Sequence, residues 1–144
     1  MNLEQFAREL SSASASIASG LEVSFRVIVK EIEETAKEKI GVYQPAYGPF
    51  DAWVPLAEST KADRVRRGYS EDEPLLRSGD LRDSIQSDVM GLAAIVGTKS
   101  EIGLWQEVGT SYIPPRPFIG PAYIRKIEPL MEWVELSISN GFKG

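Results

Sequence analysis

The sequence predicts an α+β fold: a small antiparallel sheet packed with a long amphipathic helix in the N-terminal half and with a C-terminal helix. Apolar residues recur at helical spacing near both ends of the chain. Between them, short β-prone runs alternate with glycine, serine and proline. A length of 144 residues is typical of one domain, so residues 1–144 are expected to form a single unit.

The clearest period lies in residues 21–40 and predicts a helix of about five turns, at ~3.6 residues per turn. Gly41 follows where a C-cap glycine is expected. The Val/Ile run at the centre of this segment also permits a strand. Before it, Asn2 is expected to cap a short helix that fades into a Ser/Ala run and stops at Gly20. Residues 1–20 are therefore expected to be a loosely attached N-terminal helix.

Two segments, 42–54 and 68–74, are predicted to be loops. The first, with its sequence YQPAYGPFDAW from residue 43, combines aromatic residues with two prolines, and the second is polar and acidic. Between the loops, residues 55–67 indicate a short helix with a basic end. Its basic residues are expected to complement an acidic patch on the same or a neighbouring subunit; they are Arg64, Arg66 and Arg67.

Short elements are predicted in the next stretch. Ser78 or Asp80 is expected to cap a short helix that buries Leu81 and Ile85. Residues 87–98 indicate two strands around Gly91. The side chains expected to face inward from them are Val89, Ala94 and Val96.

A further helix is predicted from a cap at Ser100 to Val108, closed by Gly109. The proline-dense segment after it must be extended and rigid, because Pro114, Pro115 and Pro117 fix the backbone. Two interpretations of this strip remain open. It presents Arg116 and Phe118 to another chain, or it is a buried connection that positions the C-terminal helix, which tolerates Pro129.

Composition narrows the possible functions. The chain has no cysteine and no histidine, which removes thiol nucleophiles, Cys/His zinc sites and imidazole catalysis. Carboxylate chemistry stays possible, but no catalytic residue, metal ligand or cofactor site is predicted. The formal net charge is −5, so the chain lacks the excess of basic residues that is typical of nucleic-acid-binding proteins. No apolar stretch approaches the ~20 residues of a membrane helix, and the acidic N-terminus does not look like a signal peptide.

Three segments taken together resemble the tail-completion, or neck, proteins of tailed phages, a family of virion morphogenesis proteins. They are WVPLAESTKADR (53–64), PLLRSGDLRDSI (74–85) and VGTKSEIGLWQEVGTSYIPPRPFIGPA (96–122). Together with the residues between them, the three segments span about half of the chain. The departures from the family pattern are apolar: Leu104-Trp105 for Tyr-Ala, Val108 for an aromatic residue and Ile119 for leucine.

The resemblance implies a structural protein without catalysis that assembles as a homo-oligomeric ring, a hexamer, at the head–tail junction of the virion. It would be made in the host cytoplasm. Its implied partners are the head connector or head-completion protein and the tail terminator or tail tube protein. Genomic DNA would pass through the lumen without specific binding, and no membrane is involved.

This setting gives two sets of candidate residues. Expected at subunit or partner interfaces are Arg64, Arg66, Arg67, Trp105, Pro114, Pro115, Arg116, Pro117 and Phe118. Expected to shape the motif are Gly79, Leu81, Ser84, Ile85, Gly97 and Gly109. Two other classes remain as alternatives: a monomeric protein-binding or regulatory module, and a carboxylate-dependent hydrolase, which needs two convergent carboxylates in a pocket.

Overall fold

The computed structural model describes residues 2–143, without the side chains at positions 133, 137 and 141–143. The elements of this described part are α1 (Leu3–Lys39), α2 (Glu58–Arg66), α3 (Asp80–Asp83), β1 (Gln86–Met90), β2 (Ala93–Gly97), α4 (Glu101–Val108) and α5 (Ile119–Lys143). Their order confirms the predicted α+β class with two long helices and a small antiparallel sheet.

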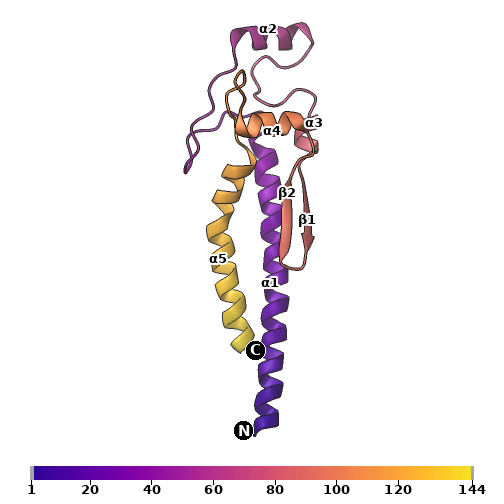
Figure 1. Cartoon of the computed structure of the whole chain (residues 1–144), viewed down its shortest axis with the longest axis vertical. Helices are drawn as coiled ribbons and strands as arrows, with labels where there is room; N and C mark the ends of the chain where they lie inside the picture. Colours follow the sequence, from indigo (N-terminus) through magenta and orange to yellow (C-terminus); the bar gives the residue numbers. More distant parts are fainter. Residues whose placement is uncertain (1, 144) are drawn as a thin grey trace.

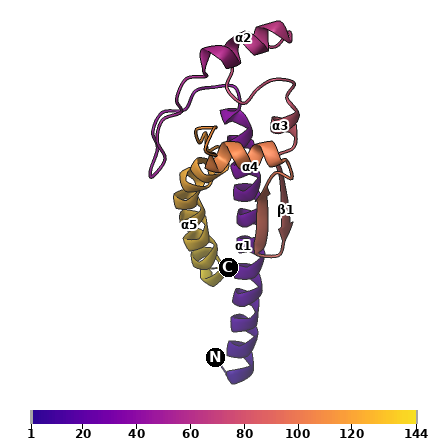
Figure 2. The same ribbon diagram turned by 45° about the horizontal axis from the view of Figure 1, so that its top comes forward.

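The molecule is elongated and has two parts (Figure 1). Helices α1 and α5 pack along each other in opposite directions and form a stem. Helices α2, α3 and α4 and the loops that join them gather at one end of the stem and form a head. The β1–β2 hairpin extends from the head along α1, on the other side from α5 (Figures 1 and 2). The N-terminal end of α1 projects beyond the end of α5 in both views.

Helix α1 is continuous, so the predicted stop at Gly20 is wrong. Its start is as predicted: the Asn2 side chain accepts a hydrogen bond from the backbone N of Gln5 at 2.8 Å, and the Gln5 side chain accepts one from the Asn2 backbone N at 3.0 Å. A glycine inside a helix costs only about 1 kcal/mol relative to alanine. The apolar stripe crosses it, because Ile17 and Leu21 on either side are both half-buried. Packing of this face outweighs the local glycine penalty.

The hairpin has the predicted position around Gly91, whose φ of 60° suits a tight two-residue turn. Val89 is half-buried, and Val96 packs against the core. Ala94 lies opposite Val89 and on the same face of the hairpin as Val96, as expected, but its side chain is exposed. A two-stranded sheet that packs on a single helix buries the residues next to the core, and a small side chain near the turn stays uncovered.

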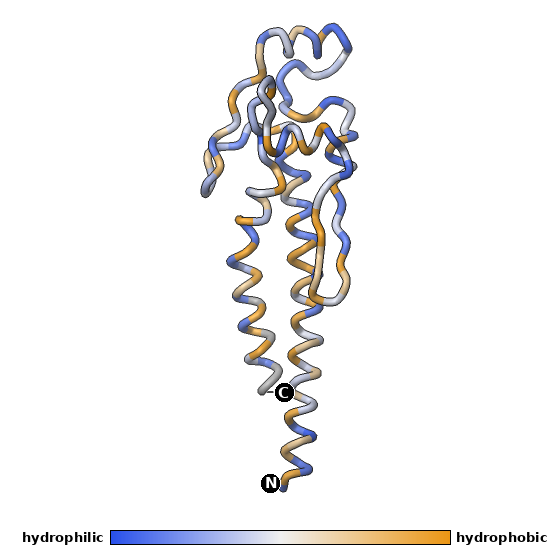
Figure 3. The backbone as a smooth tube through the Cα atoms, viewed as in Figure 1, coloured by the Kyte–Doolittle hydropathy of each residue, from blue (hydrophilic) through white to orange (hydrophobic). Residues whose placement is uncertain are grey.

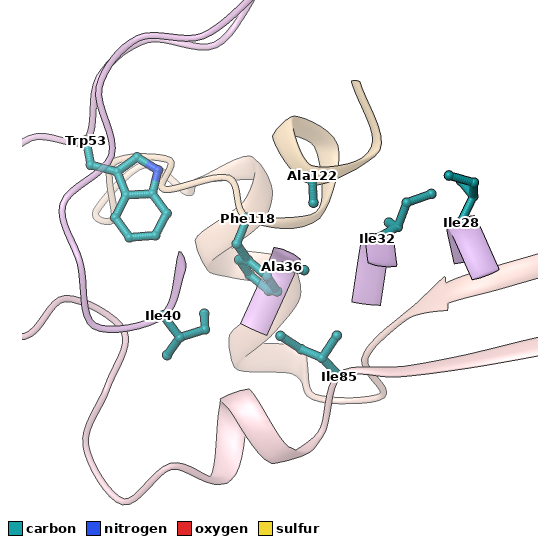
Figure 4. Close-up of a cluster of buried hydrophobic side chains, with 8 residues drawn as sticks. All are labelled: Ile28, Ile32, Ala36, Ile40, Trp53, Ile85, Phe118 and Ala122. Atoms are coloured by element: carbon teal, nitrogen blue, oxygen red, sulfur yellow. The ribbon is translucent and has the colours of Figure 1, made fainter. Parts of the chain in front are cut away.

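The hydrophobic core lies where the head meets the stem (Figure 4). Phe118 and Ile85 are completely buried and point toward α1 near Ala36. The full cluster of buried residues is Ile28, Ile32, Ala36, Ile40, Trp53, Ile85, Phe118 and Ala122. These residues come from α1, the loop before α2, the segment after α3 and the start of α5. The core therefore fixes the head to the stem at one point.

Candidate assembly site

The proline strip, residues 114–118, is held inside the chain by hydrogen bonds. Arg116 is 5% exposed, and its Nη2 donates to the carbonyl oxygens of Val54 at 3.0 Å and Pro55 at 3.2 Å. Its backbone N donates to the carbonyl oxygen of Gln106. Burial lowers the pKa of Arg116 from its usual value, because the charged form is desolvated. The guanidinium thus joins the strip to the loop before α2.

The rest of the strip is also an internal connection. The Trp53 Nε1 donates to the carbonyl oxygen of Pro117 at 3.1 Å, and Phe118 fills the core. The strip therefore does not present Arg116 and Phe118 on the outer surface, because both side chains are buried. The second interpretation, a buried connection that positions α5, is the one that this geometry fits. Pro114 and Pro115 remain exposed.

A carboxylate that the sequence analysis did not single out caps the first turn of α5. Glu107 Oε2 accepts hydrogen bonds from the backbone N of Phe118 at 2.7 Å and of Ile119 at 3.0 Å. Its Oε1 accepts one from the backbone N of Gly120 at 2.7 Å. The first N–H groups of a helix have no partner within the helix, and their partial positive charge favours an anion. Glu107 therefore caps α5 from α4, across the chain.

The predicted arginine cluster divides into two functions. Arg64 is 3% exposed, and its Nη1 donates to the carbonyl oxygens of Leu76 at 2.7 Å and Ser70 at 3.2 Å. Arg66 and Arg67 instead pair with Asp63 on the same helix. The hydrogen bond from Arg67 leads the contacts that lower the pKa of Asp63. Each of the three arginines therefore has at least one partner on the same chain, and their role at an interface stays a prediction.

The motif residues around α3 build its turn and its anchor. Gly79 caps α3 at φ 92°, a left-handed conformation that suits glycine, as the Ser-Gly-x-Leu pattern predicts. The Ser78 Oγ accepts the backbone N–H of Asp80 at 3.3 Å. The Ser84 hydroxyl donates to the carbonyl oxygen of Leu81 at 2.6 Å and lies 2.6 Å from the Thr98 hydroxyl. This pair joins α3 to the end of β2.

The glycines of the segment 96–122 differ in whether their position requires glycine. Gly109 has φ 75°, and a Cβ there would lie 3.0 Å from the carbonyl oxygen of Ile113 and from Pro115. Gly103, which the sequence did not single out, allows an even closer approach, since a Cβ would lie 2.5 Å from the Thr98 methyl carbon. Nothing in the structure requires glycine at Gly97, where a Cβ would meet open space.

One buried carboxylate links the stem to the hairpin. Glu33 on α1 accepts hydrogen bonds from Lys30 and Lys37, both at 2.9 Å, and from the Ser87 hydroxyl of β1. Burial opposes ionisation of this group, but the hydrogen bonds from Lys37, Ser87 and Lys30 outweigh it and hold its pKa at about 2. Glu33 is therefore ionised at neutral pH and connects two elements.

Exposed apolar side chains occur in several parts of the described chain, and they include the following three groups. The α4 patch consists of Leu104, Trp105, Val108 and Tyr112, of which Tyr112 is 95% exposed. The hairpin patch consists of Met90, Leu92 and Ile95. The stem end consists of Leu3, Phe6 and Leu10, in the first turns of α1. The N-terminal end of α1 projects beyond the end of α5 (Figure 3). Among the predicted interface residues, only Trp105 belongs to one of these surfaces.

The stem end extends the stripe that packs in the stem. Leu3, Phe6 and Leu10 are followed at the same alternating spacing of three and four residues by Ala13 and Ile17, which are half-buried. A stripe with this spacing is the pattern of a helix that packs on another helix. The apolar face of α1 therefore runs past the end of its partner helix.

The head also contains a cavity of about 540 Å³, bordered by α2, α3, α4 and the proline strip. Asp80 is the one carboxylate among the described residues that line it, whereas a hydrolase of the kind considered above needs two. No cluster of three or more metal-ligating side chains occurs in the described part of the chain. Within the same residues, no helix is both long and apolar enough to span a bilayer.

Comparisons with known proteins identify the family of the chain. The sequence model of the phage virion morphogenesis family matches residues 1–120. The Mu-like prophage FluMu G protein 1 of Haemophilus influenzae is 26% identical over 107 residues, which cover 74% of this chain and 71% of that protein. No solved structure gives a significant match. Family membership indicates a structural, virion-associated role in phage morphogenesis, and the chain belongs to the phage virion morphogenesis family.

Proposed function

We propose that the protein is a tail-completion or neck protein, which joins or completes the head-proximal end of the tail by ring assembly. The observation that carries this proposal is the set of three exposed apolar surfaces on a chain whose buried charged groups stabilise its own fold. Contiguous exposed apolar surface is typical of contacts between proteins. In a ring each copy contacts two neighbours through two different faces, and one chain with separate apolar surfaces meets that need.

The partners in this proposal are other copies of the chain, six in a hexameric ring, the head connector or head-completion protein, and the tail terminator or tail tube protein. The net charge of −5 is compatible with genomic DNA that passes through the lumen without binding to it. A ring whose lumen is lined with lysine and arginine would contradict this last point.

The test is deletion of the gene from the phage genome that encodes the protein, followed by electron microscopy of the lysate. We expect filled heads and separate tails that fail to join, with tailed particles restored when the chain is supplied from a plasmid. Tailed, infectious particles in the absence of the chain would overturn the proposal. Averaged images of the neck from restored particles would then give the copy number, for which we expect six.

A further inference from the structure

The cavity in the head has polar features that the chain itself leaves without partners. Arg64, from α2, and Arg116, from the proline strip, both line it and are almost completely buried. Both guanidiniums donate hydrogen bonds to backbone carbonyl oxygens, and neither forms an ion pair with a carboxylate of the described residues. A buried charge without a counter-charge is costly, so an anion at this position would be stabilised.

The charge that lines the cavity is strongly asymmetric. A third guanidinium, Arg77, borders it together with the exposed carboxylate of Asp80. Arg77 lies 3.7 Å from Asp63, a carboxylate that Arg66 and Arg67 already share. In a chain with five more acidic than basic residues, this cavity is therefore a local concentration of positive charge.

The residues that line the cavity, taken together, indicate which anion-bearing molecule fits. Arg64 Nε is a donor without an acceptor, and Gln106 Oε1 is an acceptor without a donor, and both residues line the cavity. A phosphate ion offers both acceptors and a hydroxyl donor, but it has no apolar group to fit the remaining walls of the cavity. A peptide offers carbonyl oxygens and N–H groups together, and an acidic side chain adds the anion.

The remaining walls of the cavity are apolar. They include Leu56, Leu75, Leu81, Ile102, Ile113 and Pro114. Such walls suit apolar side chains on either side of a carboxylate, since pockets of this kind combine apolar area with a few polar groups that fix orientation.

We propose that this cavity binds a short extended segment of another protein, in which an Asp or Glu lies next to an apolar residue. The carboxylate lies among Arg64, Arg77 and Arg116, and the peptide backbone meets the amide of Gln106. The inference rests on the proposed function only for the source of the segment, a protein of the particle. The chemistry of recognition follows from the cavity alone.

The test is selection from a random library of short linear peptides on the immobilised full chain, followed by binding measurements on the enriched peptides. We expect sequences that combine an acidic residue with an apolar neighbour. Replacing the acidic residue by its amide should weaken binding about tenfold, because the buried guanidiniums then lose their counter-charge. An excess of inorganic phosphate should leave most of the peptide bound.

A pair of matched variants on α4 locates the binding. Ile102→Glu adds a negative charge to the cavity wall, and Leu104→Glu adds the same charge two residues away, outside the cavity. Both side chains are more than half exposed, so both variants should fold, which thermal unfolding checks. We expect Ile102→Glu to weaken peptide binding about tenfold or more through like-charge repulsion, and Leu104→Glu to leave it nearly unchanged.

Three results would overturn the proposal: no enriched peptide that distinguishes Ile102→Glu from the unaltered chain, equal binding of the acidic and amide peptides, or displacement by phosphate. Because binding is measured on the isolated chain, failure here leaves the neck function standing. Conversely, a deletion phage that still makes tailed particles would refute the neck function and not the cavity.

Discussion

The head and the stem of this protein use their charged and apolar residues in opposite ways. In the head, Arg64, Arg116 and Glu107 bind backbone atoms of distant segments and hold irregular loops in one arrangement. In the stem, two helices pack through an apolar stripe, and the stripe continues past the contact at Leu3 and Phe6. The buried motif residues of the head therefore stabilise the fold, whereas the free apolar surface of the stem lies outside the three segments.

The largest difference in stability is expected between two phenylalanine variants, one in the core and one at the stem end. Phe118→Ala removes a fully buried ring from the core and should lower the free energy of unfolding by about 4 kcal/mol. Phe6→Ala, on the exposed stem end, should lower it by less than about 1 kcal/mol. Urea unfolding followed by circular dichroism measures both. Equal losses would mean that the stem end is packed in solution.

A second comparison is between a buried arginine of the proline strip and an exposed arginine of α2. Arg116→Ala leaves the carbonyl oxygens of Val54 and Pro55 without their buried donor and should cost about 2–3 kcal/mol. Arg66→Ala removes an exposed ion pair with Asp63 and should change stability by less than about 1 kcal/mol. Thermal unfolding distinguishes them. If the Arg116 variant unfolds like the unaltered protein, the strip does not depend on its guanidinium.

The pH dependence of stability tests the contact between stem and hairpin. The pKa of Glu33 is about 2 in the folded chain and has an ordinary value of 4.5, so folding favours the ionised form. Its contribution is complete above pH about 4.5 and is lost as the pH falls toward 2, by about 3 kcal/mol. Glu33→Gln should lack this part of the acid dependence, whereas Glu34→Gln, on the exposed side, should keep it. Identical pH profiles for the two variants would contradict the assignment.

A smaller effect is expected at the start of α5. Glu107→Gln keeps one oxygen but loses the charge and the second acceptor, so at least one N–H of the first turn loses its partner. The expected loss is about 1–2 kcal/mol, the usual range for a helix cap with its dipole interaction. Glu101→Gln, an exposed change in the same helix, is the control. Amide hydrogen exchange at Phe118, Ile119 and Gly120 should rise in the Glu107 variant alone.

The sequence predicted the parts of the fold that depend on neighbours along the chain. Ser100 caps α4 and Gly109 closes it, because caps involve contacts within a few residues. The stop at Gly20 failed, since packing against α5 overrode a local preference. The role of Glu107 could not be predicted, because the N–H groups that it caps lie 11 to 13 residues further along.

The site was predictable only in part, for the same reason. The resemblance marked the segments that contain Arg64 and Arg116, but the burial of both side chains and their place beside the cavity depend on the whole fold. The side chains of the stem end look like the start of any amphipathic helix. They become a candidate surface only once the end of α5 is located.

The most direct test is assembly with a folded protein whose stem end is polar. Phe6→Ser, supplied to the deletion phage, should leave the unfolding temperature of the purified chain nearly unchanged and sharply reduce the fraction of tailed particles seen by electron microscopy. Glu9→Ser, an exposed polar change on the same end of α1, should support normal assembly. Tailed particles at the normal fraction with Phe6→Ser would contradict the central claim, that the free apolar face of the stem is an assembly surface.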